Sequence, residues 1–497
     1  MIKKSLKIAL GTLTLIISTQ LHAIPAKSTP LEGTQIGVAY TLPNSQQIYG
    51  KNIDTFMQPA STLKVVTALA AVLYLGQDYT LKTLLEVPPQ NLNQDGSLLL
   101  GEDGVLNGNV LIKFTGDPSF KSNDYMTLVQ SLSRAGVKKI NGSVILDLSR
   151  FGGLSRGQGW SWNDLPVCFT APAGAAIINR NCTFANLQPH GIGKIASSAV
   201  PQGVPISIDS EVYGISPENY GINCELEANL YRNNHYRISG CVPVQKQNKP
   251  WPLSLAVSDP EQWAVDWTNI VFNKQKIQID GIKISHESIK DYATFGYIES
   301  KPLKELLKYM LYRSNNLYAD AIAKNVAYEY YKLPATYQRT TAAIRSILAR
   351  YANIDLENAY FVDGSGLSPH NIVSPHIMLN ILEYINQNDD KLNFIELLPV
   401  AGVSGSLHWR ASTSQPPLAK NVAAKTGTLQ NISNLMGFIT TKSGKRVSFV
   451  MYTGALNYDQ KTRDMVKYRR MASPHLGYER YVLEQIYNEK VMGRDFN

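Results

Sequence analysis

The stretch from Thr62 to Leu75 limits the possible folds of this chain more than any other segment. It is rich in Ala, Leu and Val, it contains no Gly or Pro, and Gly76 follows it, which together predict an α-helix with a glycine at its C-terminal end. Apolar residues cover nearly the whole circumference of this helix, so we expect it to lie buried in the core of a domain. One charged residue, Lys64, falls inside this apolar stretch, and a buried lysine requires an explanation.

Ser61 stands directly before the predicted helix, three residues ahead of Lys64, and residues at this spacing share one face of a helix. A serine hydroxyl becomes an effective nucleophile when a nearby base accepts its proton. A lysine can be that base once burial has lowered its pKa, and the apolar helix supplies the burial. No other serine in the chain has a lysine three residues later. Taken alone, the pair is equally well explained by a helix-capping serine and a lysine that extends to solvent.

A second pair of polar residues, Ser314 and Asn316, lies at the start of another predicted helix, residues 316–331. A second hydroxyl near a lysine base could pass a proton to a leaving amine, and an asparagine amide could hold the backbone of a peptide substrate. Without other evidence, however, a role for Ser314 as a helix cap is the better explanation.

A third group, Lys425, Thr426 and Gly427, lies in a segment of small residues that is typical of an edge strand. A glycine there would let a substrate backbone approach the strand and extend the sheet. The lysine and threonine side chains could bind a substrate carboxylate, and the lysine charge would further lower the pKa of Lys64. A solvated lysine beside a turn is the simpler alternative.

The first 23 residues predict the compartment. Three lysines precede an apolar run, residues 8–17, which is too short to span a bilayer comfortably. We therefore expect a signal peptide, residues 1–23, cleaved after Ala23, with a retained membrane anchor as the alternative. No later stretch of the sequence is long and apolar enough for a transmembrane helix. A basic exported protein suits an anionic environment such as cell-wall polymer, and export argues against a nucleic-acid partner.

The four cysteines neither form a C-x-x-C pair nor have a histidine at metal-ligand spacing. In an exported chain an even number favours disulfides over a zinc site or a thiol nucleophile. Of the three possible connectivities we prefer the one between sequence neighbours, Cys168–Cys182 and Cys224–Cys241, because each bond closes a short loop. Free buried thiols are the alternative.

The pattern of apolar residues changes along the chain. A hairpin is predicted near the N-terminus, with strands over residues 35–40 and 47–49. From about residue 80 to residue 245, short apolar runs alternate with Gly, Asn, Asp and Pro, which is typical of a β-rich module. Helical patterns follow over residues 303–312, 316–331, 342–351 and 377–385, and then a hairpin, 434–440 and 447–453, and a C-terminal helix, 478–491. The two ends of the chain therefore predict one α/β domain with a β-rich insertion.

The three groups of polar residues occur in the order S-x-x-K, S-x-N and K-T-G, which is the signature set of penicillin-binding proteins and serine β-lactamases. The gap of 253 residues between Ser61 and Ser314 is far longer than a β-lactamase or a minimal carboxypeptidase needs. A large insertion at this point resembles the low-molecular-mass class C penicillin-binding proteins, the D-alanyl-D-alanine carboxypeptidase/endopeptidases of the penicillin-binding protein 4 type. Further matching segments are residues 115–119, 160–164 and 363–368.

This resemblance implies an α/β (α+β) catalytic domain of the serine β-lactamase/transpeptidase type with a large β-rich insertion. We expect residues 24–82 to form the first segment of the catalytic domain, residues 83–299 the inserted domains, and residues 300–497 the second segment. We assign no chemistry to residues 363–368, which could be only a glycine-rich turn at the border of the site.

The resemblance also implies the catalytic residues. Ser61 would be acylated, Lys64 would be the base, and Ser314 and Asn316 would complete the proton relay and the grip on the substrate. Lys425 would bind the terminal carboxylate of the substrate. No metal or organic cofactor is expected, because Lys64 would itself transfer the proton.

Substrate-binding residues follow from the same likeness. Thr426, Gly427 and Thr428 would contact the substrate beside Lys425, and the backbone N–H groups of Ser61 and Thr428 would form an oxyanion hole.

In this family an acidic residue of the insertion binds the free amino group of a diaminopimelate side chain. Asp164 matches that position, and Phe169 and Leu429 would be its apolar walls. The alternative is that Asp164 is only a turn residue near Cys168.

The implied activity is hydrolysis of peptidoglycan peptides in the periplasm. Ser61 would attack a D-Ala–D-Ala or D-Ala–diaminopimelate bond, water would hydrolyse the acyl-enzyme, and β-lactams would be covalent inhibitors. We expect no nucleic-acid partner and at most a peripheral membrane contact. Two alternatives remain: a β-lactamase, for which the insertion has no evident purpose, and a non-catalytic wall-binding scaffold, against which the intact Ser61 and Lys64 argue.

Overall fold

The computed structural model describes residues 24–220, 224–245, 249–356, 358–467 and 471–492. The predicted signal peptide, residues 1–23, lies outside the described residues, so its cleavage stays a prediction. Within the described ranges, no helix is both long and apolar enough to cross a membrane.

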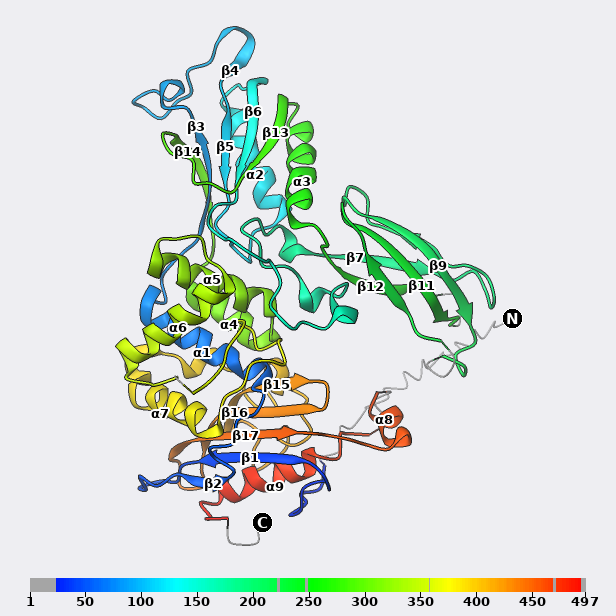
Figure 1. Ribbon diagram of the computed structural model, residues 1–497, viewed down its shortest axis with the longest axis vertical. Coiled ribbons are helices and arrows are strands. Elements are labelled where there is room, and N and C mark those ends of the chain that lie inside the picture. The colour runs from blue at the N-terminus through cyan, green and yellow to red at the C-terminus, as the bar shows by residue number, and fades with distance from the viewer. Residues whose placement is uncertain (1–23, 221–223, 246–248, 357, 468–470, 493–497) are drawn as a thin grey trace, which may run out of the picture.

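A five-stranded antiparallel sheet unites the two ends of the chain (Figure 1). Every residue of the first strand in the sequence pairs with a residue of the last strand, from Gln35 opposite Gly454 to Tyr40 opposite Phe449. The edge strand predicted around Lys425 is indeed at the edge. Residues 399–401 pair with its first three residues, and from Lys425 onward no described strand pairs with its outer side. In spatial order the strands are β15 (Val422–Leu429), β16 (Ile432–Thr440), β17 (Arg446–Gly454), β1 (Gln35–Tyr40) and β2 (Tyr49–Lys51).

Helices cover both faces of this sheet, because alternate residues of a strand point to opposite sides. Phe449 and Met451 share a core with the C-terminal helix α9 (Leu476–Tyr487), whereas Val450 and Tyr452 belong to the core on the other face. The helices on that other face are α1 (Leu63–Leu75), α4 (Leu303–Arg313), α5 (Asn316–Tyr331), α6 (Tyr337–Ala352) and α7 (Pro375–Leu392).

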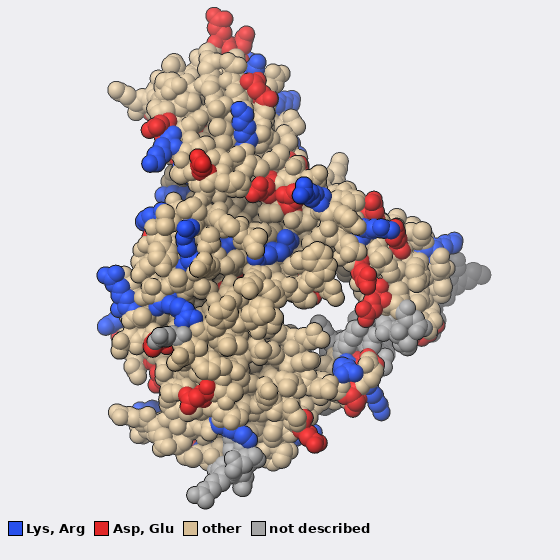
Figure 2. All heavy atoms as spheres, in the orientation of Figure 1, with Lys and Arg blue, Asp and Glu red and all other residues tan. Residues whose placement is uncertain are grey.

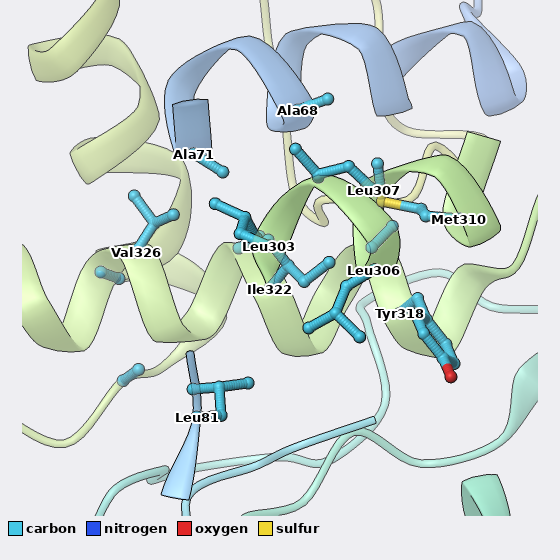
Figure 3. Packing of buried hydrophobic residues seen from close by; sticks show 14 of the residues in the cluster. Ala68, Ala71, Leu81, Leu303, Leu306, Leu307, Met310, Tyr318, Ile322 and Val326 are labelled. Atoms are coloured by element: carbon cyan, nitrogen blue, oxygen red, sulfur yellow. The ribbon is translucent and has the colours of Figure 1, made fainter. Parts of the chain in front are cut away.

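The apolar helix predicted over residues 62–75 is confirmed as α1, and it ends at Gly76, whose φ is 81°. Small residues of α1, Ala68 and Ala71, face α4, from which Leu303 and Leu307 point toward α1 (Figure 3). All four side chains are almost completely buried, and small residues on one helix let the two backbones approach closely. This packing places the first turn of α1, with its lysine, in the interior of the domain.

The insertion begins with a six-stranded sheet. The first and last strands of this sheet, β3 and β14, pair with each other from Lys82 opposite Glu299 to Val87 opposite Ala293, so the chain leaves and re-enters the catalytic domain side by side. We therefore propose to keep residues 83–299 as the inserted domains. The strands are β13 (Gln278–Ser285), β6 (Lys139–Asp147), β5 (Val110–Lys113), β3 (Lys82–Val87) and β14 (Ala293–Glu299), with β4 (Val105–Asn107) beside β6.

The description of the insertion as β-rich was incomplete, because two helices, α2 (Ser122–Arg134) and α3 (Pro260–Lys274), belong to it. Helix α2 buries Tyr125, Leu128, Val129 and Leu132, which recur at helical spacing. Helix α2 is polar on average, so its helical pattern was weaker than that of the short apolar runs around it, and the sequence predicted strands for this region.

A second body of the insertion consists of two three-stranded sheets around a core of their own. Both predicted disulfides, Cys168–Cys182 and Cys224–Cys241, are present, with Cα atoms 5.3 Å and 5.9 Å apart. The sheets are β10 (Glu227–Leu230), β11 (His235–Pro243) and β9 (Ser207–Ile215), and β12 (Trp251–Ala256), β7 (Cys182–Gln188) and β8 (Ser197–Ala199).

Candidate active site

Ser61 lies in a short 3-10 turn, residues 60–62, that leads into α1. Ala60 adopts a φ of 50°, a left-handed conformation that is uncommon for a residue with a Cβ atom. The turn is held by two hydrogen bonds to the Pro59 carbonyl oxygen, from the Thr62 hydroxyl at 2.7 Å and from the Asn434 side-chain amide at 3.0 Å. Ser61 makes no helix-capping hydrogen bond, so the capping alternative is wrong for this serine.

The side chain of Lys64 is completely buried, and its Nζ atom has three oxygen neighbours. It donates to Ser61 Oγ at 2.8 Å, to Asn316 Oδ1 at 2.6 Å and to the Ser365 carbonyl oxygen at 2.7 Å. The amide of Asn316 is oriented by its own donation to the Phe169 carbonyl oxygen at 2.8 Å. The amide oxygen and the carbonyl oxygen can only accept. A neutral lysine amine would therefore give both N–H bonds to them and turn its lone pair toward the Ser61 hydroxyl.

Burial lowers the pKa of Lys64 from 10.5 to about 8, although the carboxylates of Asp320 and Asp363 oppose the shift. The sequence analysis expected the charge of Lys425 to act on Lys64. This repulsion is mutual, and burial together with the charge of Lys64 lowers the pKa of Lys425 well below its usual range. Two buried ammonium groups so close together disfavour each other, so we expect the pair to hold one proton near neutral pH.

Lys425 connects the edge strand to Ser314. Its Nζ atom donates to Ser314 Oγ at 2.9 Å and to the Thr426 carbonyl oxygen at 2.7 Å. Ser314 has a φ of 51° between α4 and α5, and the residue that caps α5 is Asn315, whose side chain accepts from the Tyr318 N–H group at 3.0 Å. The helix-cap explanation of Ser314 is therefore also wrong, and its hydroxyl instead accepts a hydrogen bond from Lys425.

Gly427 makes room for the turn that carries Ser61. A Cβ atom at this position would lie 2.7 Å from the Pro59 carbonyl oxygen, so the edge strand packs directly against that turn. This contact lies on the face of the strand, so the approach of a substrate backbone along the strand edge at Gly427 stays a prediction. The next residues, Thr428 and Leu429, line the cavity.

The active-site cavity has a volume of about 660 Å³. Asp164 and Phe169 of the insertion reach it, and Lys64, Lys425, Thr426 and Gly427 lie behind its surface. The structure therefore brings the three motifs and the two insertion residues together. The residues of interest that line the cavity are Ser61, Ser314, Asn316, Asp164, Phe169, Thr428 and Leu429.

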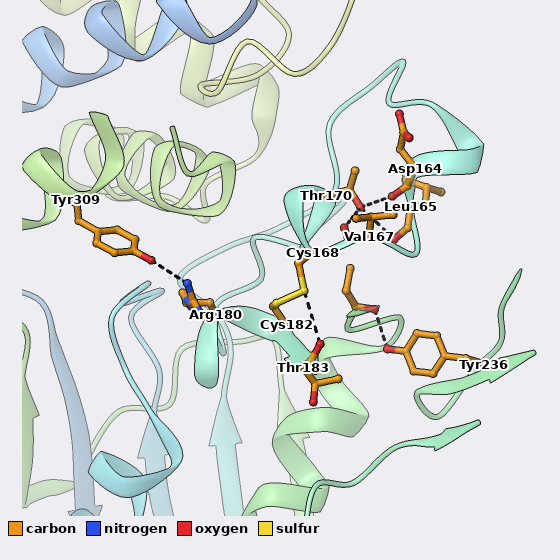
Figure 4. Close-up of a disulfide and its surroundings, with 11 residues drawn as sticks. Asp164, Leu165, Val167, Cys168, Thr170, Arg180, Cys182, Thr183, Tyr236 and Tyr309 are labelled. Atoms are coloured by element: carbon orange, nitrogen blue, oxygen red, sulfur yellow. Dashed lines mark hydrogen bonds between the residues drawn. A yellow bond between two sulfur atoms is a disulfide. The ribbon is translucent and has the colours of Figure 1, made fainter. Parts of the chain in front are cut away.

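Asp164 lies in a loop that the Cys168–Cys182 disulfide joins to β7 (Figure 4). The Thr170 hydroxyl supports the loop by donating to the Asp164 carbonyl oxygen at 2.9 Å. The Asp164 carboxylate points away from the disulfide, and no described residue donates to it. A turn residue usually bonds its own backbone through the side chain, so the free carboxylate favours a binding role over a purely structural one.

Residues 363–368 contribute more than the sequence analysis assigned to them. The buried Asp363 carboxylate accepts from the Trp160 indole at 3.0 Å and from the backbone N–H groups of Gly366 and Ser368 at 2.7 Å each. These bonds fix the loop so that the Ser365 carbonyl oxygen faces Lys64. A sequence does not show where a carbonyl group points, so only the parallel match of residues 160–164 and 363–368 to one family could have indicated this contact.

Asn316, Asp320 and Lys324 form a buried polar stripe along α5, at intervals of four residues. Asp320 accepts from the Gly364 N–H group at 2.8 Å, and Lys324 donates to the Ala173 carbonyl oxygen of the insertion at 2.9 Å. The stripe therefore links Lys64 to the insertion. Asp320 and Lys324 were not among the predicted site residues, although their spacing in an apolar helix is visible in the sequence.

Ser406 is another residue that the sequence analysis missed. Its hydroxyl oxygen accepts from the Thr426 hydroxyl at 2.9 Å, so its own hydrogen can be donated to a bound carboxylate. No group of His, Cys, Asp or Glu within the described ranges is arranged to hold a metal ion.

Known proteins that are similar to this chain identify its family. The model of the D-Ala-D-Ala carboxypeptidase 3 (S13) peptidase family matches residues 17–471. The chain belongs to this family. The D-alanyl-D-alanine carboxypeptidase DacB of Haemophilus influenzae is 38% identical over 446 residues, which are 88% of this chain and 90% of the relative. The penicillin-sensitive carboxypeptidase A of Dictyostelium discoideum is 27% identical and matches 83% of this chain and 81% of its own.

Solved structures confirm the predicted fold class. Penicillin-binding protein 4 (dacB) of Haemophilus influenzae superposes with a TM-score of 0.84 at 37% identity, covering 92% of this chain and 98% of the other. A structure of that protein complexed with a novel β-lactam gives a TM-score of 0.80 at 34% identity, with the same coverage. The family resemblance drawn from the motifs is thereby confirmed, and the chain is a D-Ala-D-Ala carboxypeptidase of the S13 family.

Replacing Gly427 by Ala tests the contact between the edge strand and the Ser61 turn. The new Cβ atom would push against the Pro59 carbonyl oxygen and displace Ser61, so acylation by a penicillin should slow by about 100-fold. The rate is measured with a fluorescent penicillin in stopped flow.

Gly281→Ala is the matched control, because a Cβ atom there would have no neighbour within 4 Å. It should acylate at the wild-type rate. An unimpaired Gly427→Ala protein would show that the close contact does not position the nucleophile.

Proposed function

We propose that this carboxypeptidase cleaves peptidoglycan peptides through an acyl-enzyme on Ser61, that it also acts as a D-Ala–diaminopimelate endopeptidase, and that β-lactams inhibit it. The proposal rests on the hydrogen bonds around Lys64 Nζ. The amide oxygen of Asn316 and the carbonyl oxygen of Ser365 can only accept, so they take both N–H bonds of a neutral amine. The lone pair of the amine then points to the third neighbour, Ser61 Oγ. A lysine held in this way is a general base for serine.

Acylation begins when Ser61 Oγ attacks the carbonyl carbon of the scissile bond and Lys64 Nζ takes the serine proton. The backbone N–H groups of Ser61 and Thr428 stabilise the oxyanion. When the C–N bond breaks, the Ser314 hydroxyl gives its proton to the leaving amine and receives one from Lys425, with which it already shares a hydrogen bond. The pair of lysines thus keeps one proton, which now lies on Lys64. Once solvent has exchanged this proton back to Lys425, the neutral Lys64 takes a proton from the water that attacks the ester and returns it to Ser61 Oγ as the ester C–O bond breaks.

The substrate's terminal carboxylate has an electrostatic role in this scheme. It binds beside Lys425, with the hydroxyls of Thr426, Thr428 and Ser406, and so raises the pKa of that lysine. The single proton of the pair then resides on Lys425, which leaves Lys64 neutral and able to act as the base. A carboxylate is therefore required for catalysis as well as for binding, which fits a carboxypeptidase.

Asp164 binds the free amino group of a diaminopimelate side chain, between Phe169 and Leu429. The support for this assignment is its place on the cavity wall and the absence of any described donor to its carboxylate. An ammonium group supplies the missing charge and hydrogen bonds.

The reaction takes place in the periplasm, on peptidoglycan peptides. Two disulfides support an oxidising compartment. Lys and Arg side chains are interspersed with Asp and Glu on the face shown in Figure 2, a pattern that favours neither a nucleic-acid surface nor more than peripheral membrane contact.

The proposal is tested by mass spectrometry and by digestion of purified muropeptides. The wild-type protein should gain the mass of one penicillin, release D-Ala from monomeric pentapeptides and split cross-linked dimers, whereas Ser61→Ala should do none of these. A wild type without an adduct would leave only the non-catalytic scaffold. Rapid turnover of the penicillin, on the scale of about 10 s⁻¹, would favour the β-lactamase.

The role of Lys64 predicts a pH profile. The base must be neutral, so the second-order rate of penicillin acylation should rise with pH, by about tenfold per unit on the acid side, and level off above the free-enzyme pKa of about 8. The rate is measured from about pH 5 to about pH 10. A rate that is constant over this range would contradict the assignment of Lys64 as the base.

Asp164→Asn tests the amine-binding site. KM for a diaminopimelate-containing peptide should rise about tenfold, because a charge-assisted bond is lost, while the penicillin acylation rate stays unchanged. Acetylating the free amino group should produce the same increase with the wild type and no further one with the variant. Asp280→Asn, an exposed change elsewhere in the insertion, should have no effect. If Asp164→Asn and Asp280→Asn behaved alike, Asp164 would be a turn residue only.

A further inference from the structure

A second hollow, of about 680 Å³, lies next to the active-site cavity at the tip of the β15–β16 hairpin. The tip is held by a hydrogen bond of 3.0 Å from the Leu456 N–H group to the Asn431 carbonyl oxygen. The two hollows therefore share a wall, which consists of Thr428, Leu429, Gln430 and Ile432.

The proposed direction of the substrate leads from the active site to this hollow. Its terminal carboxylate lies beside Lys425 and its reacting carbonyl beside Thr428, which is three residues further along the edge strand. The substrate therefore runs antiparallel to β15, and the part of the peptide that precedes the reacting residue continues past Leu429 toward the hairpin tip. A peptide long enough to leave the active-site cavity on that side reaches the second hollow.

Within the part of the chain that the structure describes, two charged side chains line the hollow, those of Arg410 and Arg463. Arg410 is fully paired, because it makes two hydrogen bonds of 2.6 Å with the buried Glu479 carboxylate. Among the described residues, Arg463 donates to two neutral oxygens, Asn457 Oδ1 at 3.2 Å and Gln460 Oε1 at 3.1 Å. A guanidinium group has five N–H donors, so Arg463 retains donors for an anion. Hydrogen bonds from Thr462 and, to a smaller extent, the charges of Lys461 and Arg463 lower the pKa of the exposed Asp459 carboxylate, which lies outside the lining.

The remaining lining is neutral and partly apolar. Leu456, Val466 and Leu476 form an apolar surface, and Tyr458 adds a hydroxyl. Burial lowers the pKa of His475 to about 4, so this residue is uncharged at neutral pH. The hollow therefore suits a short alkyl stem that ends in a carboxylate. Asp459 and Asp464, the acidic neighbours of Arg463 in sequence, are not among its lining residues.

We infer that this hollow is a second subsite, in which Arg463 binds a carboxylate of the peptide segment that precedes the reacting residue. Arg463 belongs to α8 (Gln460–Lys467), which projects beside the catalytic sheet at the lower right of Figure 1 and carries both basic and acidic side chains in Figure 2. The inference rests on the proposed function, because it uses the direction of the bound peptide. It adds a specificity for anionic peptides to that function.

Two matched stem peptides test the inference. Both end in D-Ala-D-Ala, and they differ only in whether the carboxylate of the residue before the diamino acid is free or amidated. Arg463→Gln should raise KM for the free-acid peptide by about fivefold, as expected for one partly exposed ion pair, with kcat unchanged. KM for the amidated peptide should stay at the wild-type value.

Two further variants complete the design. Arg463→Lys should restore part of the preference for the free-acid peptide, and Lys461→Gln, an exposed charge on the same helix outside the lining, should change neither KM. Penicillin acylation, which does not reach the hollow, should proceed at the wild-type rate in every variant. The preference of the wild type should also weaken at high salt.

If Arg463→Gln changed KM equally for the two peptides, or changed neither KM, the subsite would be refuted. Hydrolysis of the peptides would still support the proposed function. If the wild type cleaved neither peptide, the proposed function would fail, and the inference would fail with it.

Discussion

The amine of Lys64 lies among three oxygen atoms that come from three distant parts of the chain: a serine before α1, an asparagine at the start of α5, and a backbone carbonyl of the loop at residue 365. Each contact alone is an ordinary hydrogen bond. Together they use both N–H bonds of a neutral amine and direct its lone pair to one hydroxyl. The rest of the fold has to keep these three segments within hydrogen-bond distance of one buried nitrogen, and a shift of about 1 Å in any of them would cost catalytic power.

The insertion takes part in this arrangement and is more than an added domain. Asn316 is oriented by a carbonyl of the insertion at Phe169, and the loop that carries Ser365 is fixed through Asp363 by the indole of Trp160. Lys324 donates to two further carbonyls of the insertion, at Leu154 and Ala173. If the insertion were absent, buried groups of the catalytic domain would lose their partners, at a cost of about 1–3 kcal/mol each. The long gap between the first two motifs is thus part of the catalytic structure.

Features with a strong local cause could be predicted from the sequence. Helix α5 has the predicted bounds, because its apolar pattern and flanking residues act within a few positions. Ser61 and Lys64 were found because both lie on one turn of helix. The carbonyl of Ser365 could not be predicted, since every residue has one and only the tertiary structure decides where it points. The packing of Gly427 against the Pro59 carbonyl oxygen could not be predicted for the same reason, because it depends on a residue more than 100 positions away.

Specificity and catalysis meet in the electrostatics of the bound peptide. In the proposed complex its carboxylate draws the shared proton to Lys425 and so frees Lys64, while its ammonium group pairs with the half-buried carboxylate of Asp164. A peptide without the carboxylate would bind to an enzyme whose base is protonated. A peptide without the ammonium group would leave the Asp164 carboxylate in the cavity without a partner. Discrimination of this kind comes from the penalty on the wrong substrate more than from affinity for the right one. Because the loop that presents Asp164 also presents the carbonyl that orients Asn316, a displacement of that loop would impair recognition of the amine and orientation of the base together.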